Sequence, residues 1–213
     1  MSRPRVLLAD DHLLVAEALK SLLTPEFDLV GVVEDGRALV AAAKELRPDV
    51  IVADVTMPQL NGIDALIQLR QGGDQVPVVF LTMHRDTAFA RRALEAGAAG
   101  FVLKHSASVE LIAALRAALQ GKTYLTPQIA GDVLEAMRGG TETDADPIDA
   151  ITPRQREVLQ LLAEGLTAKE IASNLSISAR TVEYHKYQMM ESLGLRTNAE
   201  LIHFAIKNGL IEL

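Results

Sequence analysis

The sequence predicts an α/β unit followed by an all-α unit. In the first unit we expect a five-stranded, doubly wound parallel sheet of order 2-1-3-4-5, and in the second four helices that include a helix-turn-helix. Three observations support this prediction. Short apolar runs alternate five times with helical patterns over residues 1–122, residues 123–150 are polar and acidic, and residues 151–213 carry helix caps without strand patterns.

Each expected strand is a short, mostly apolar run that leads to a polar residue. These runs are Arg5–Ala9, about 27–33, Val50–Ala53, Pro77–Leu81 and Phe101–Leu103. Apolar residues at helical spacing predict helices near residues 13–22, 38–46, 63–69, 89–94 and 108–120. The run before Asp54 has no polar position, which is typical of a parallel strand that helices cover on both faces.

The residues that follow the strands are chemically unusual as a set. Asp10 and Asp11 follow the first strand, Asp54 the third, Thr82 the fourth and Lys104 the fifth. In a sheet of order 2-1-3-4-5 the crevice for ligands lies between strands one and three, so three carboxylates meet there. Clustered carboxylates repel one another unless a cation joins them, and Mg²⁺ prefers such oxygen ligands.

The chemistry that this set predicts is formation of an aspartyl phosphate. Asp54 would be the nucleophile, while the ion and Lys104 neutralise the transferred phosphoryl group and Thr82 donates a hydrogen bond to it. Each residue alone is more often a helix cap or a turn residue. The convergence of all five on one sheet edge favours the functional interpretation.

Composition excludes several other classes. The 213 residues include no cysteine, and the five histidines show no close metal-ligand spacing. No uncharged apolar run approaches the roughly 18 residues of a membrane span, and the N-terminal apolar run is too short for a signal peptide. We therefore expect a cytoplasmic protein without a membrane partner.

Charge does not announce nucleic-acid binding. Residues 1–122, 123–146 and 147–213 carry net charges of −2, −4 and −1. DNA binding must therefore come from a local arrangement of residues. Residues 123–150 are expected to form a linker, in which Tyr124–Met137 could form one more short helix and Arg138–Pro147 has the composition of a flexible tether.

The last 63 residues contain the start and capping residues of four helices. Thr152-Pro153 starts the first, Thr167 caps a short second, Ser178 caps a longer third, and Asn198 opens the fourth. The second and third helices, joined by a tight turn, have helix-turn-helix geometry, so the third would enter the major groove.

The third helix divides into two faces. Val182, Met189 and Leu193 should pack inward, with His185 as a partly buried structural residue more than a base reader. The outer face carries Arg180, Glu183, Tyr184 and Tyr187; the glutamate can accept from cytosine, and the tyrosines can reach base edges or a thymine methyl. The expected phosphate ligands are Lys169, Arg180, Lys186 and Arg196, with Arg154 as a further candidate. The candidate DNA-binding residues are Lys169, Arg180, Thr181, Glu183, Tyr184, His185, Lys186, Tyr187 and Arg196.

The first unit resembles the receiver domain of bacterial two-component response regulators over residues 3–122. The motifs that carry the resemblance are Asp10-Asp11, Asp54-x-x-Met57-Pro58 with Asn61-Gly62, Thr82, and Phe101-x-x-Lys104. The resemblance implies that a sensor histidine kinase phosphorylates Asp54, with Mg²⁺-dependent self-phosphorylation and autodephosphorylation as the only enzymatic activity. It also implies that the Thr56 backbone carbonyl joins Asp11 and Asp54 on Mg²⁺, that Asp10 holds a metal-bound water, and that Thr82 and Phe101 act as switch residues.

The resemblance also implies that two positions near the site set the phosphoryl lifetime. Thr56 lies two residues after Asp54, and His84 lies two residues after Thr82. Both side chains could restrict an attacking water. We predict a lifetime of minutes or longer. A phosphate-release time course of seconds that His84→Ala leaves unchanged would contradict this.

The second unit resembles the LuxR-type helix-turn-helix of NarL/FixJ response regulators over residues 151–211. The matching motifs are Thr152-Pro153 to Leu159, Gly165 to Thr167, Lys169 to Ala172, Thr181-Val182-x-x-His185, Leu193-Gly194-Leu195, and Ala199-Glu200-Leu201; Glu183 and Ser192 stand where a basic residue is frequent. The resemblance implies that phosphorylation relieves contact between the domains and promotes a homodimer, through helix 198–207, that binds promoter DNA and works with RNA polymerase.

Other function classes remain open to test. The main alternative is a receiver-based signalling or phosphate-sink module whose near-neutral C-terminal unit does not bind DNA. A quorum-sensing regulator would need a small-molecule pocket in the first unit, and the phosphorylation residues argue against that. A free-standing phosphatase or hydrolase is disfavoured, because the visible chemistry concerns the protein's own aspartate.

Overall fold

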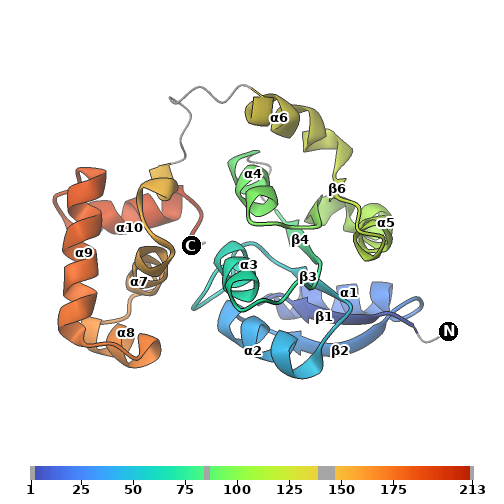
Figure 1. Ribbon diagram of the computed structural model, residues 1–213, viewed down its shortest axis with the longest axis horizontal. Helices are drawn as coiled ribbons and strands as arrows, with labels where there is room; N and C mark the ends of the chain where they lie inside the picture. The colour runs from blue at the N-terminus through green and yellow to red at the C-terminus, as the bar shows by residue number, and fades with distance from the viewer. Residues whose placement is uncertain (1–2, 84–86, 139–146, 212–213) are drawn as a thin grey trace. The chain divides into compact units, whose positions relative to one another are not determined.

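The computed structural model describes residues 3–83, 87–138 and 147–211, and the chain forms two compact units. The first unit contains a sheet with helices on both faces, and the second is helical (Figure 1). Within the described ranges, no helix is both long enough and apolar enough to cross a membrane.

The sheet of the first unit is parallel and has the order β2-β1-β3-β4-β5-β6. The predicted order of the first five strands is confirmed, and a sixth strand of two residues extends the sheet. The strands are β1 (Arg5–Ala9), β2 (Asp28–Val33), β3 (Val50–Ala53), β4 (Val78–Thr82), β5 (Gly100–Leu103) and β6 (Tyr124–Leu125).

Helices cover both faces of this sheet. In Figure 1, α1 and α5 lie on one side of the strands and α2, α3 and α4 on the other. Val6 and Leu8 of β1 pack in a core with α1 and α5, because alternate residues of a strand face opposite sides. The helices are α1 (Leu13–Leu23), α2 (Gly36–Leu46), α3 (Gly62–Gln71), α4 (Thr87–Glu95), α5 (Ala107–Leu119) and α6 (Pro127–Arg138), and a 3₁₀ turn, η1 (Lys104–Ser106), precedes α5.

Strand β6 begins the segment in which the sequence suggests a short helix. Tyr124 and Leu125 instead pair with Gly100 and Phe101 of β5, and the Thr126 amide donates to the Phe101 carbonyl at 3.0 Å. The helix starts only at Pro127, because the residue before a proline is disfavoured in helical conformation and proline suits the first helical turn. The sheet therefore continues past residue 122.

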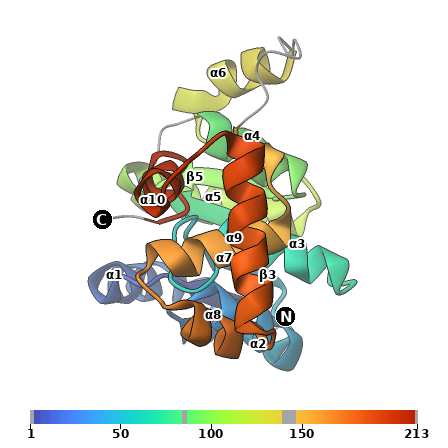
Figure 2. The same cartoon turned by 90° about the vertical axis from the view of Figure 1, so that its left-hand side faces the viewer.

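The second unit contains the four predicted helices, preceded by a 3₁₀ turn, η3 (Pro147–Ala150). Thr152 and Thr167 form capping boxes with Gln155 and Glu170, which satisfies the free amides at two helix starts. One apolar core joins the helices, and Figure 2 shows α9 as the longest element of this unit. The helices are α7 (Pro153–Ala163), α8 (Ala168–Leu175), α9 (Ala179–Leu193) and α10 (Asn198–Lys207).

A tight turn links α8 to α9. Ser176 adopts a left-handed conformation with φ 53°, the Ile177 amide donates back to the Ala172 carbonyl, and the Ser178 side chain accepts from the Thr181 amide. The predicted helix-turn-helix geometry is confirmed.

Candidate functional site

The first site lies at the carboxyl ends of β1 and β3. The two strands are hydrogen-bonded neighbours, with Ala9 beside Ala53, and the Asp54 amide donates to the Ala9 carbonyl at 2.8 Å. Side chains that follow the two strands therefore meet. Ligand atoms of Asp10, Asp11, His12 and Asp54 all lie within 4.8 Å of one another.

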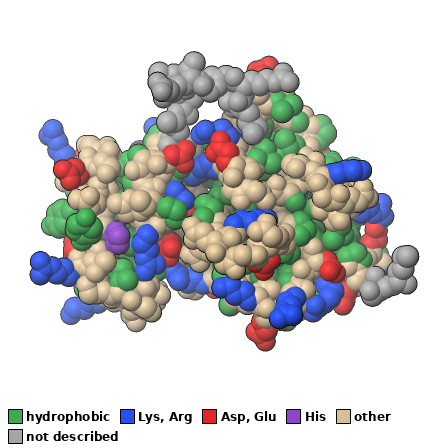
Figure 3. All heavy atoms as spheres, in the orientation of Figure 1, with side chains coloured by type: hydrophobic (Ala, Val, Ile, Leu, Met, Phe, Trp, Pro, Cys, Tyr) green, Lys and Arg blue, Asp and Glu red, His purple; other side chains and the backbone are tan. Residues whose placement is uncertain are grey.

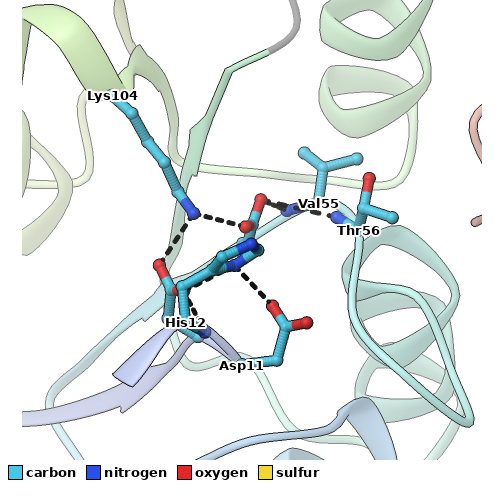
Figure 4. A network of polar contacts seen from close by, with 7 residues as sticks. Asp11, His12, Val55, Thr56 and Lys104 are labelled. Carbon is cyan, nitrogen blue, oxygen red and sulfur yellow. Dashed lines mark hydrogen bonds and ion pairs between the residues drawn. The ribbon is translucent and has the colours of Figure 1, made fainter. Parts of the chain in front are cut away.

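Lys104 joins this cluster from the end of β5. Its Nζ lies 2.5 Å from Oδ2 of Asp54 and 2.9 Å from Oδ2 of Asp10. In Figure 4 the Lys104 side chain extends toward these carboxylates, beside His12, Asp11 and the Val55–Thr56 backbone. The side chains of Lys104, Asp54 and Asp10 are at most 9% exposed, so this ammonium bridges two carboxylates with little access to water.

Burial dominates the electrostatics of the cluster. It raises the pKa of Asp54 to about 6, although the charge and hydrogen bond of Lys104 oppose the shift and Asp10 adds to it. Burial lowers the pKa of Lys104, but Asp54 and Asp10 outweigh it and the net pKa is raised. The lysine therefore stays charged, while the Asp54 carboxylate is held in a less polar environment than water.

The backbone after β3 fixes the orientation of Asp54. Its Oδ1 accepts from the Val55 amide at 2.6 Å and more weakly from the Thr56 amide at 3.4 Å. Gly62, at the start of α3, packs against the backbone of Asp54. A Cβ at Gly62 would stand 2.1 Å from the Asp54 carbonyl oxygen, closer than any real contact, so only glycine fits here.

The predicted switch residues occupy neighbouring strands. Thr82 ends β4 and Phe101 lies in β5, and both are fully buried. The register pairs Thr82 with Leu103, so Thr82 lies on the strand between Asp54 and Lys104 at the same sheet edge. Their switching roles stay predictions. His84, expected to set the phosphoryl lifetime, lies outside the described residues.

His12 belongs to the cluster but received no role from the sequence. Its Nδ1 lies 2.9 Å from Oδ1 of Asp11, and its amide donates to Oδ1 of Asp10 at 2.9 Å. Its position directly after Asp10-Asp11 was the available signal. Together, the four side chains offer oxygen and nitrogen ligands that suit a divalent cation, and the oxygens suit Mg²⁺ best.

A second candidate site is the exposed face of α9. Tyr184 and Tyr187 are 60% and 65% exposed, whereas Val182 and Met189 on the opposite side are buried in the core. Arg180, one turn before Tyr184, is also exposed. The predicted division of this helix into an inner and an outer face is therefore confirmed.

The polar residues around this face differ in their exposure and in their contacts with the protein. Lys169 and Arg196 are exposed, whereas the Thr181 hydroxyl oxygen lies 2.8 Å from the Ser178 hydroxyl oxygen. Lys186 Nζ lies 2.5 Å from Oε2 of Glu183. In Figure 3 the basic side chains on the face in view are scattered among acidic and hydrophobic ones, in keeping with the near-neutral charge of residues 147–213.

His185 lies at the edge of the α9 face and is partly buried. Burial lowers the pKa of His185, and the positive charge of Arg154 lowers it further. Arg154 itself is held in place, since it donates to Oε2 of Glu157 at 2.9 Å and to the Leu175 carbonyl at 2.8 Å. These contacts fit a structural role for His185 and Arg154.

The two sites define a class of protein: a receiver-like domain with an acidic site, linked to a helix-turn-helix domain. A family model of the response regulator receiver domain matches residues 6–116, and one of the bacterial regulatory proteins of the luxR family matches residues 149–205. The chain belongs to the response regulators that combine these two domains. They are regulators, not typical metabolic enzymes.

Individual relatives extend over almost the whole chain. The oxygen regulatory protein NreC of Staphylococcus epidermidis is 32% identical over 98% of this chain and 99% of its own length. The transcriptional regulatory protein MctR of Rhizobium johnstonii is 33% identical over 97% of this chain and 95% of its own length. Among solved structures, RcsB of Salmonella enterica serovar Typhimurium, bound to a promoter with the phosphomimetic BeF₃⁻, matches with a TM-score of 0.64 at 27% identity, over 95% of this chain and 98% of RcsB.

Proposed function

We propose that this response regulator accepts a phosphoryl group on Asp54 from a sensor histidine kinase and then binds promoter DNA as a homodimer. The observation that carries the first half is the Lys104 ammonium, which bridges Asp54 and Asp10 at 2.5 Å and 2.9 Å in a buried site. A buried, oriented carboxylate beside a fixed cation is what phosphoryl acceptance requires.

In the proposed reaction, an Asp54 carboxylate oxygen attacks the phosphorus of a phosphohistidine. The new P–O bond forms as the P–N bond breaks, and the imidazole leaves with the electron pair and takes up a proton. Lys104 neutralises negative charge on the transferred phosphoryl group. Thr82 moves toward this group and donates a hydrogen bond to it. Phe101, which lacks a hydroxyl, would switch through packing alone.

The donor set fits a resident Mg²⁺. Asp11 and Asp54, with the Thr56 backbone carbonyl, would hold the ion, and Asp10 would hold a water on it; His12 lies beside them. When bound, the ion supplies positive charge against the phosphoryl oxygens. The chain's own contribution is to place these oxygens together before the ion arrives, through the pairing of β1 with β3.

The proposed output comes from α9. Its exposed face would enter the major groove, while Lys169, Arg180 and Arg196 contact phosphates. We propose residues 1–122 as receiver, 123–150 as a linker whose first part forms β6 and α6, and 151–213 as DNA-binding domain. RNA polymerase as a partner, α10 as dimer contact, and a cytoplasmic location complete the proposal.

The test is DNA binding under control of the phosphoryl site. Full-length wild type and Asp54→Asn would be titrated against a library of genomic promoter fragments, with and without beryllofluoride and Mg²⁺. We expect tighter binding and a shift to dimer in wild type alone. Binding that is unchanged by beryllofluoride would refute the coupling between the phosphoryl site and DNA binding. No binding in any state would support the alternative function, a phosphate-sink module. The near-neutral charge of the second unit is the observation that favours this alternative.

Autodephosphorylation is tested separately. We propose that phosphorylated Asp54 hydrolyses over minutes or longer, because Thr56 and His84, two residues after Asp54 and Thr82 in the sequence, would restrict an attacking water. Phosphate release would be followed in wild type and His84→Ala, with Asp54→Asn as the blank. Release within seconds in both proteins contradicts this part of the proposal.

A further inference from the structure

Glu183 and Lys186 form an ion pair on α9 in which the lysine is more buried than the glutamate. Lys186 Nζ lies 2.5 Å from Oε2 of Glu183, one helical turn away. The same ammonium lies 5.6 Å from the ring centroid of Tyr187. Only 16% of the Lys186 side chain is exposed, so most of its length lies along the protein surface rather than extending into solvent.

This geometry gives the two partners different access to DNA. Glu183 keeps 41% of its side chain exposed and belongs to the same outer face of α9 as the highly exposed Tyr184 and Tyr187. Lys186 is the covered member of the pair. A carboxylate is acceptor-only and has about four lone-pair positions, of which Lys186 uses one, so capacity remains for another donor.

Major-groove chemistry restricts what that donor is. Phosphates repel a carboxylate, and guanine and thymine present no donor in the major groove. Adenine presents its N6 amino group beside the N7 acceptor, a pattern that pairs with an amide side chain rather than with a carboxylate. Cytosine presents its N4 amino group there, and a carboxylate is the matching acceptor. The lysine charge lowers the cost of bringing the carboxylate near the DNA backbone.

We propose that Glu183 is a specificity-determining residue that reads a cytosine amino group, and that Lys186 is its positioning residue instead of a phosphate ligand. This inference rests on the proposed function, since it requires α9 to enter the major groove. It narrows that function to one base contact and excludes Lys186 from the phosphate ligands that the sequence predicts.

The experiment uses full-length protein with beryllofluoride and Mg²⁺, and duplexes selected from a randomised library by wild type. At the preferred cytosine, matched duplexes carry each other base or 2-pyrimidinone, which lacks only the amino group. We expect wild type to bind the 2-pyrimidinone duplex about tenfold more weakly, and Glu183→Gln to lose most of this difference. An unchanged difference in Glu183→Gln overturns the base assignment.

Salt dependence separates positioning from phosphate binding. Lys186→Met should reduce the discrimination between cytosine and 2-pyrimidinone while leaving the slope of log K against log salt unchanged. Lys186→Arg, which keeps the ion pair, should restore discrimination. The matched control, Lys169→Met, should make the slope shallower by about 0.9 and weaken all duplexes alike.

The outcomes are distinguishable from failure of the proposed function. If Lys186→Met behaves like Lys169→Met, Lys186 is a phosphate ligand and its positioning role is refuted. If wild type binds salt-dependently without preferring any base, this inference fails while the proposed function stands. If wild type binds no duplex in any state, both fail. Circular dichroism melting confirms that each variant is folded.

Discussion

Two lysine–carboxylate pairs, one in each unit, have the same contact distance and different surroundings. Lys104 and Asp54 lie 2.5 Å apart with side chains 9% and 7% exposed, and Lys186 and Glu183 lie 2.5 Å apart with side chains 16% and 41% exposed. In the first pair a second carboxylate, Asp10, shares the lysine. In the second, Tyr187 borders it.

The difference shows that distance alone does not measure an ion pair. The Asp54 side chain is 7% exposed, so burial shifts its pKa and removal of its partner would leave a charge with little solvation. The Glu183 side chain is 41% exposed, and water screens its attraction to Lys186. In the roles proposed above, the first pair prepares a reaction, and the second orients a side chain at little energetic cost.

The largest effect should follow loss of the buried lysine. We expect Lys104→Met to destabilise the first unit by about 3 kcal/mol at pH 7.5, because Asp10 and Asp54 remain buried without their cation. Urea unfolding measures the change. Added Mg²⁺ should restore more stability to this variant than to wild type, and equal effects on both would show that Lys104 does not compensate the carboxylates.

The next effect concerns the backbone behind Asp54. Gly62→Ala should destabilise by about 1–3 kcal/mol, because its Cβ would lie 2.1 Å from the Asp54 carbonyl oxygen. The matched control is Gly131→Ala in α6, where a Cβ meets nothing within 4 Å and helix propensity should stabilise by about 0.5–1 kcal/mol. Thermal unfolding of both variants measures these changes. Stabilisation by Gly62→Ala would mean that the Asp54 backbone shifts without cost to make room for the Cβ.

The exposed pair should show a much smaller effect on stability. Lys186→Met is expected to change the free energy of unfolding by less than about 1 kcal/mol, because the pair is partly solvated. Urea unfolding of the same series of variants measures it, with sodium chloride up to about 1 M as a screen. A loss as large as that of Lys104→Met would erase the distinction between the two pairs.

The smallest effect should be a pH dependence from His185. Its pKa is lowered in the folded state, so the fold favours the neutral ring. Its contribution to stability is present above the unfolded pKa of about 6.5 and declines as pH falls below it. Unfolding of His185→Gln between pH 5 and 8 should show less of this decline than wild type does. A steeper decline in His185→Gln would contradict the sign.

Much of the fold and part of the site follow from the sequence. The apolar runs that lead to Asp10, Asp54, Thr82 and Lys104 identify strands and place these residues on one edge, because parallel strands end together. The helix caps Thr152, Thr167 and Ser178 have side-chain oxygens that accept from free amides, which is a local property. The roles of these residues in chemistry and DNA contact stay predictions.

The remaining features depend on contacts that sequence patterns do not encode. β6 has two residues, too few for any periodicity, and forms only because β5 offers a free edge. His12 joins the carboxylate cluster through a tertiary arrangement. The sequence predicts that Lys186 is a basic residue near DNA. Its contact with Glu183 depends on the side-chain rotamers of both residues, which the sequence does not give.

Strand β6 also has a consequence for how the first unit can be isolated. It caps the outer edge of β5, whose residues Gly100–Leu103 are all buried. Ending the chain at residue 122 would uncover the edge at Gly100 and Phe101, and an unpaired apolar edge can template intermolecular pairing and aggregation. An isolated receiver should therefore extend through α6 to Arg138, with this short edge strand acting as its protection against self-association.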